Sequence, residues 1–162
     1  MKAVFDSKQI SQAVSAVSPF TPARTSKDIL KNIKLAVSGD QATISATDSE
    51  NSIIYYLRGV EVQHAGCVLL PASKLRSILG EAPVGERMVI EVINGIAHIS
   101  YSRSKFKIPT EDASGFPDVR EFDESSFVTI KAQSLRRMLL RTVFCCDKIS
   151  TRYALSLSLI HI

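Results

Sequence analysis

Few residues of this chain have the types and spacing that catalysis requires. Asp48 and Glu50 form the acidic pair best placed to act together, but a nuclease that uses two metal ions needs more carboxylates around them. We therefore interpret residues 47–50 as a polar turn between two strands, capped by Asp48. His98 alternates with apolar neighbours, which is more typical of a strand residue than of a general base. The chain also lacks the motifs of serine hydrolases, P-loop proteins, dinucleotide-binding proteins and zinc proteases, so we expect no enzyme active site.

Metal and disulfide chemistry are equally poorly supported. The chain has three cysteines, Cys67, Cys145 and Cys146, with no CxxC motif, and adjacent cysteines rarely pair with each other. The three histidines are scattered, without the spacing of zinc ligands. We expect free, mostly buried cysteines, no metal site and no cofactor.

Charge and hydropathy indicate a cytoplasmic globular protein. Twenty Lys and Arg residues against 16 Asp and Glu give the 162-residue chain a net charge of +4. The excess lies mostly in residues 123–162, with six basic and three acidic side chains, and it permits a polyanionic partner without requiring one. No stretch approaches the roughly 20 apolar residues of a membrane helix. The N-terminus reaches Asp6 too soon for a signal peptide.

A repeated plan organises the chain: a short apolar strand, a polar cap and an amphipathic helix, found three times. Ile10, Leu75 and Leu135 are the equivalent first anchors of the three apolar helix stripes. The predicted strands and helices cover residues 3–5 and 7–17, 67–70 and 71–79, and 127–130 and 132–142.

Between the helices the apolar period changes to two, which predicts antiparallel strands. Residues 33–37 and 42–46 form a first hairpin, and the dipeptide Asn94-Gly95 between two apolar runs strongly indicates a second. Residues 1–66 and 67–118 therefore each read as strand, helix and three strands. We predict one α+β domain of repeated β-α-β-β-β units, with two helices packed on one face of antiparallel sheet.

The remaining residues suggest the beginning of another such domain. Residues 119–126 are polar and read as a connector, after which residues 127–155 read as the truncated start of a second domain. We expect residues 156–162 to be a non-native tail, because their apolar sequence does not continue the repeat.

The predicted helices carry several cations and few acids. Arg137 and Arg141 are spaced four residues apart on the third helix, with Arg136 beside them, and Lys74 lies outside the apolar stripe of the second helix. Such a face suits sequence-independent attraction to phosphate, although an ordinary solvated helix surface has the same composition.

Together these features resemble the bacterial DNA sliding clamp, the beta subunit of DNA polymerase III. The resemblance extends from residue 1 to about residue 155 and depends on the order and spacing of several short motifs. These are Thr47-Asp48 with Glu50, Pro71-Ala72 with Lys74, the run Ser102 to Phe106, Phe116-Pro117, and Arg152-Tyr153 with Leu155.

The resemblance implies the DNA clamp fold and a non-catalytic processivity factor of DNA replication. A full-length clamp of this family is a ring-shaped homodimer that encircles duplex DNA without sequence preference. It tethers the DNA polymerase III catalytic subunit and other replication and repair proteins, and a clamp loader places it on DNA. The resemblance therefore implies a cytoplasmic protein that contacts no membrane.

The resemblance also implies roles for individual residues. Tyr153 matches one of two adjacent aromatic positions, of which the second is Ala154 here, and Ile149 departs from a polar position in relatives. Two residues match part of the pocket that receives partner peptides, Arg152 and Leu155. The implied DNA-binding residues are Arg24, Lys74, Arg136, Arg137, Lys148 and Tyr153.

An alternative function of a different class stays open at this point. The chain could be a stand-alone protein-interaction module that uses a sheet edge or its helices and encircles no DNA. Duplex binding that weakens steeply with salt would favour the clamp, whereas salt-insensitive peptide binding would favour the interaction module.

Overall fold

The computed structural model describes residues 1–120, 123, 125–147 and 153–159. The chain divides into two compact units, Met1–Glu121 and Phe122–Ile162.

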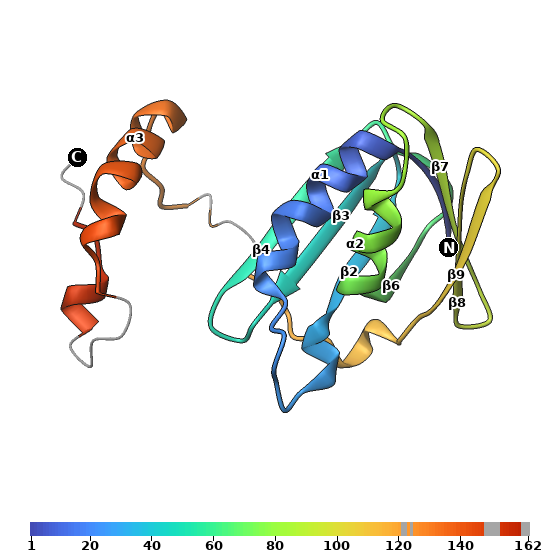
Figure 1. Ribbon diagram of the computed structural model, residues 1–162, viewed down its shortest axis with the longest axis horizontal. Coiled ribbons are helices and arrows are strands. Elements are labelled where there is room, and N and C mark those ends of the chain that lie inside the picture. The colour runs from blue at the N-terminus through green and yellow to red at the C-terminus, as the bar shows by residue number, and fades with distance from the viewer. Residues whose placement is uncertain (121–122, 124, 148–152, 160–162) are drawn as a thin grey trace. The chain divides into compact units, whose positions relative to one another are not determined.

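The described residues of the first unit form nine strands, two α-helices and three short 3₁₀ turns (Figure 1). The helices are α1 (Ser7–Val17) and α2 (Ala72–Gly80). The strands are β1 (Lys2–Asp6), β2 (Asn32–Ser38), β3 (Gln41–Thr47), β4 (Ser52–Arg58), β5 (Glu61–His64), β6 (Gly66–Pro71), β7 (Arg87–Ile93), β8 (Ile96–Tyr101) and β9 (Ser104–Pro109). The 3₁₀ turns are η1 (Ser18–Phe20), η2 (Asp28–Lys31) and η3 (Ala113–Gly115).

The strands form two antiparallel sheets that exchange their helix-preceding strands. Sheet A has the order β5-β1-β7-β8-β9, and sheet B has the order β4-β3-β2-β6. Strand β1 therefore pairs with the hairpin of the second repeat, while β6 pairs with the hairpin of the first. Because each repeat supplies a strand to the other's sheet, neither repeat can complete its hydrogen bonding alone.

In both repeats, the strand that precedes the helix makes a further antiparallel pairing on the side away from the exchanged hairpin. Strand β5 is an edge strand of sheet A and pairs with β1, with Ala3 opposite Val62. In the second repeat, an isolated antiparallel bridge joins Leu69 of β6 to Glu111. The sequence prediction missed β5, since the strand has four residues and only the half-buried Val62 is shielded from solvent.

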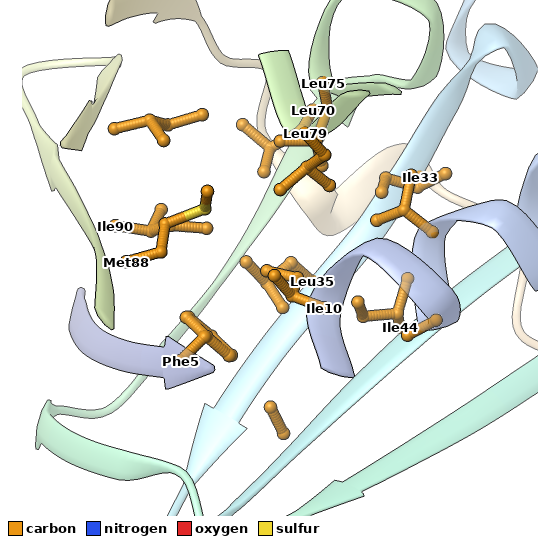
Figure 2. Close-up of a cluster of buried hydrophobic side chains, with 14 of the residues drawn as sticks. Phe5, Ile10, Ile33, Leu35, Ile44, Leu70, Leu75, Leu79, Met88 and Ile90 are labelled. Carbon is orange, nitrogen blue, oxygen red and sulfur yellow. The ribbon is translucent and has the colours of Figure 1, made fainter. Parts of the chain in front are cut away.

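The core lies between the two sheets and the two helices. Figure 2 shows side chains from both sheets and both helices gathered in one cluster, including Phe5 of sheet A, Leu35 of sheet B, Ile10 of α1 and Leu75 of α2. Ile10 and Leu75 have no exposed surface, which confirms both as anchors of their helices. A cluster drawing on both repeats explains why the strand exchange is stable, because burial of apolar surface is the main force holding the layers together.

Local turn chemistry agrees with the sequence. Asn94 and Gly95 have φ angles of 50° and 73°, which confirms the predicted turn with positive φ at both central residues. Ala42 and Ala97, the second residues of β3 and β8, are both buried in the core.

The second unit is organised around one helix, α3 (Ala132–Thr142), followed by the short turns η4 (Val143–Cys145) and η5 (Tyr153–Ser156). The helix has the predicted bounds, but the predicted strand over residues 127–130 is absent. In the first unit, a helix-preceding strand takes its ladder partner from the hairpin of the other repeat. The described residues of the second unit contain no strand that could be such a partner, so residues 127–130 belong to no ladder there.

The expectation of mostly buried cysteines is wrong. All three are free; Cys67 and Cys145 are exposed and Cys146 is half-buried. Cys67 alternates along β6 with Val68 and Leu70, which point into the core, so its own side chain faces away from the core. Partial burial nevertheless raises the pKa of the Cys67 thiol.

Candidate nucleic-acid interface

The helices α1 and α2 lie side by side over the sheets of the first unit. In Figure 1 they cover one side of sheet B, with α1 against β3 and β4, and α2 also contacts β6 and β9. Helical periodicity explains this placement: the residues Ile10, Ala13, Val14 and Val17 of α1 and Ala72, Leu75 and Leu79 of α2 are buried. The other side of each helix faces solvent.

The solvent side of these two helices carries positive charge and no negative charge. Lys8 on α1, with Lys74 and Arg76 on α2, is exposed. Neither helix contains an Asp or Glu residue. We call the exposed surface of α1 and α2 the cationic helix face. Helices whose charged residues are all cations favour the approach of phosphates.

A loop beside the cationic helix face adds further cations. Arg24 is exposed in the segment between η1 and η2, and Lys27 follows it. The N–H of Lys27 donates to the Thr25 hydroxyl at 3.1 Å, which orders the loop locally. In η2, Lys31 forms an ion pair with Asp28 (2.6 Å from Nζ to Oδ1), and this pair lowers the pKa of the Asp28 carboxyl.

A groove of about 400 Å³ lies where this loop meets the start of α2. Sequence reasoning did not find it. No local pattern predicts the groove, because its walls come from three segments that only folding brings together. The lining residues are Ser18, Thr21, Pro22, Ala23, Lys31, Ala72, Ser73 and Arg76.

The predicted DNA-binding residues fall into separate parts of the chain. Arg24 and Lys74 belong to the first unit and are exposed there. Arg136 and Arg137 are exposed on α3 of the second unit, where Arg137 lines a small hollow with Gln133 and Ser134. The structure therefore presents both pairs to solvent, each within its own unit.

The other predicted site residues are described only in part. Lys148 and Arg152 lie outside the described residues, as does Ile149. Tyr153 begins the turn η5, and Leu155 in the same turn is half-exposed, at 52%. The N–H of Asp147 donates to the carbonyl of Leu155 at 2.9 Å.

The acidic run after the first hairpin is a capped turn, as predicted. The Asp48 carboxylate accepts hydrogen bonds from the N–H groups of Asn51 (2.6 Å) and Glu50 (2.9 Å). These donors hold the pKa of Asp48 below its ordinary value. The Asp48 carboxylate therefore acts as the cap of its own turn.

Within the described residues, no group of three or more His, Cys, Asp and Glu side chains is arranged to hold a metal ion. In the same part of the chain, none of the helices is long and apolar enough to cross a membrane.

The family of the chain follows from its first 120 residues. The sequence model of the family described as DNA polymerase III beta subunit, N-terminal domain, matches residues 1–120. The chain belongs to this family. The match covers the two exchanged repeats of the first unit, including both helices of the cationic helix face.

Similar proteins agree with this assignment. The beta sliding clamp of Pseudomonas putida is 29% identical over 139 residues, covering 86% of this chain and 38% of the relative. The crystal structure of the DNA polymerase III beta subunit from Pseudomonas aeruginosa bound to griselimycin superposes with a TM-score of 0.87 at 26% identity, covering 96% of this chain and 42% of that one. The beta subunit from Caulobacter crescentus gives a TM-score of 0.85 at 28% identity, with the same coverage.

The comparisons establish the fold and the share of the relatives that the chain covers. The fold is the predicted α+β clamp fold, with antiparallel sheets and helices on one side. The chain spans about two fifths of the length of the curated relatives it matches.

Proposed function

We propose that this chain is part of a sliding clamp, a non-catalytic processivity factor of bacterial DNA replication. The observation that carries the proposal is the family match over residues 1–120, which coincides with the unit that presents the cationic helix face. An acid-free, cationic pair of helices suits a protein that must hold DNA without reading its sequence.

In this proposal the complete clamp is a ring-shaped homodimer around duplex DNA in the cytoplasm. The ring tethers the DNA polymerase III catalytic subunit, and a clamp loader opens and closes it. A tether of this kind acts through effective concentration: a polymerase that releases its template stays close to the DNA and rebinds at once. The clamp itself makes and breaks no covalent bond.

The proposed contacts are those that the resemblance implies. Arg24 and Lys74 of the first unit, with Arg136 and Arg137 of α3, would attract the DNA backbone, and their exposure supports this role. Lys148 and Tyr153 are proposed for the same role. Residues 127–155 would begin a second clamp domain, in which Arg152 and Leu155 would form part of a pocket for partner peptides.

A domain-replacement experiment tests the proposal. Residues 1–120 of this chain would replace the matching N-terminal residues of the Pseudomonas putida beta sliding clamp, which supplies the rest of a full-length protein. A clamp loader would place the hybrid on a nicked circular plasmid, and gel filtration would separate DNA-bound from free protein. We expect the hybrid to elute with circular DNA and to be released when the plasmid is cut once.

The control is the unaltered Pseudomonas putida clamp, taken through the same loading and cutting steps. A hybrid that folds and dimerises but never elutes with circular DNA would contradict the proposal. Salt-insensitive binding of a peptide by the 162-residue chain, combined with that failure, would favour the interaction module.

A further inference from the structure

The groove between the loop after α1 and the start of α2 has a distinct chemical character. Of the eight residues that line it, the charged ones are Lys31 and Arg76, both cations, and the set includes no acidic and no aromatic residue. We propose that this groove binds a backbone phosphate of duplex DNA through Lys31 and Arg76. The inference rests on the proposed function. It adds two residues of the first unit to those proposed to contact DNA.

The two cations approach the groove from different elements. Lys31 ends η2 and Arg76 lies in the middle of α2, so tertiary structure alone brings them to one cavity. An arginine guanidinium presents several N–H donors in a planar fork that matches two phosphate oxygens, while a lysine ammonium supplies a compact point charge. Together they offer complementary contacts to one tetrahedral anion.

The remaining walls leave room for a phosphodiester. Ala23, Ala72 and Ser73 are small side chains, and Pro22 fixes the backbone on the loop side. The Ser18 hydroxyl donates to the carbonyl of Val14 at 2.6 Å, so it reinforces the end of α1. The groove is thus a hollow with two cationic side chains at its wall.

Lys31 already has a partner, and this partner must be displaced. Its ammonium lies 2.6 Å from the Asp28 carboxylate, and the side chains are 47% and 84% exposed. Exposed ion pairs of this kind contribute little to stability, because water and salt screen them. Asp28 does not line the groove. A phosphate inside the groove can therefore recruit Lys31 at small cost.

The surroundings favour a nucleic-acid backbone over a free nucleotide. A nucleotide site commonly stacks its base on an aromatic side chain, and no aromatic residue lines this groove. Arg76 also belongs to the cationic helix face, so the groove is continuous with the surface proposed to face duplex DNA.

Binding by the full 162-residue chain would be mapped by two-dimensional NMR, with a short blunt duplex and inorganic phosphate as separate probes. We expect the duplex to shift the backbone amide signals of Ala23, Lys31 and Ser73. Inorganic phosphate at the same total concentration of phosphate groups should shift these signals much less. Equal shifts by both probes would identify a site for free phosphate and overturn the assignment to duplex DNA. Shifts confined to other residues, or no shift at millimolar duplex, would overturn the groove itself.

A charge-matched pair of double variants tests the two side chains. We expect Lys31→Gln with Arg76→Gln to raise the Kd for duplex about tenfold and to reduce the slope of log K against log salt by roughly 1 to 2. The control, Lys105→Gln with Lys107→Gln, removes the same charge from exposed positions on β9. Equal weakening by both double variants would overturn the inference, since only net charge would then matter.

A third variant should strengthen binding. Asp28→Asn frees Lys31 from its ion pair and is expected to lower the Kd by more than Asp40→Asn, which removes the same charge from an exposed turn. An equal effect of the two variants would contradict the role of Lys31. If the plasmid hybrid is retained while these groove variants behave like their controls, the groove inference alone fails; if the hybrid is not retained, the ring function fails.

Discussion

Ser7 and Glu86 form two hydrogen bonds with each other, although they are 79 positions apart in the sequence. The N–H of Ser7 donates to the Glu86 carbonyl at 2.9 Å, and the N–H of Glu86 donates to the Ser7 hydroxyl at 3.1 Å. That hydroxyl also donates to the carbonyl of Pro83 at 2.6 Å. The start of α1 in the first repeat is therefore fastened to the loop that precedes β7 in the second.

Removing this hydroxyl should destabilise the first unit. Ser7 is buried, at 2% exposure, so Ser7→Ala leaves the carbonyl of Pro83 and the N–H of Glu86 without this partner. We expect the free energy of unfolding to fall by about 1–3 kcal/mol in urea denaturation. The matched control is Ser15→Ala on the exposed side of α1, where alanine has the better helix propensity. A loss at Ser15 as large as that at Ser7 would contradict the explanation.

The equivalent anchors of the two helices should prove similarly important. Ile10 and Leu75 have no exposed surface and belong to one cluster. Ile10→Ala and Leu75→Ala are each expected to cost about 2–5 kcal/mol, because a cavity remains where the side chain was. Val84→Ala is the control, since Val84 is 79% exposed and its truncation should change stability by less than about 0.5 kcal/mol. Thermal unfolding followed by circular dichroism would measure all three, and a mild effect at either anchor would argue against one shared core.

Two glycines should respond to alanine with opposite signs. Gly95 has a φ of 73° in the hairpin turn, a conformation that costs an L-residue about 1–2 kcal/mol, so Gly95→Ala should destabilise. Gly80 was predicted just beyond the second helix but is the last residue of α2, and a Cβ there would meet nothing within 4 Å. Gly80→Ala should therefore stabilise by about 0.4–1 kcal/mol, through a less flexible unfolded chain. Chemical denaturation of both variants checks the signs, and two changes in the same direction would be incompatible with these backbone conformations.

The Asp48 turn should contribute stability that depends on pH. Hydrogen bonds from the N–H groups of Asn51 and Glu50 hold the pKa of the folded Asp48 below its ordinary value of 3.8. The contribution is therefore fully present above the unfolded pKa and is lost as the pH falls through the lower folded pKa. Asp48→Ala should lower the urea midpoint at pH 7, and its difference from the original chain should shrink at pH 3.

The control for this prediction is Asp40→Ala, which removes the same charge from the other exposed turn of sheet B. We expect its effect on the midpoint to change less between the two pH values. A gap between Asp48→Ala and the original chain that widens in acid would have the wrong sign for a carboxylate stabilised by hydrogen bonds.

Local features of this chain were readable from sequence because they depend on neighbouring residues. Helical spacing located α1 and α3 with the observed bounds, and the pair Asn94-Gly95 specified its turn because both residues tolerate positive φ. The buried stripes of Ile10 and Leu75 followed from the same periodicity. These signals need only one element at a time.

Tertiary structure decided everything that depends on which elements meet. The strand exchange of β1 and β6 could not be read from either repeat, because a strand's pattern does not identify its ladder partner. For the same reason, the apolar residues 127–130 looked like a strand but have no ladder in the structure. Cys67 is exposed because its neighbours in β6 already occupy the core side.

The groove shows most clearly the difference between what the sequence determined and what the fold decided. Sequence alone shows only that Lys31 and Arg76 are cations. That they line one acid-free hollow beside the loop after α1 is a property of the fold, since the two residues are 45 positions apart and belong to different elements. Helix and turn preferences act over a few residues, whereas the burial that joins two repeats into one core acts over the whole unit.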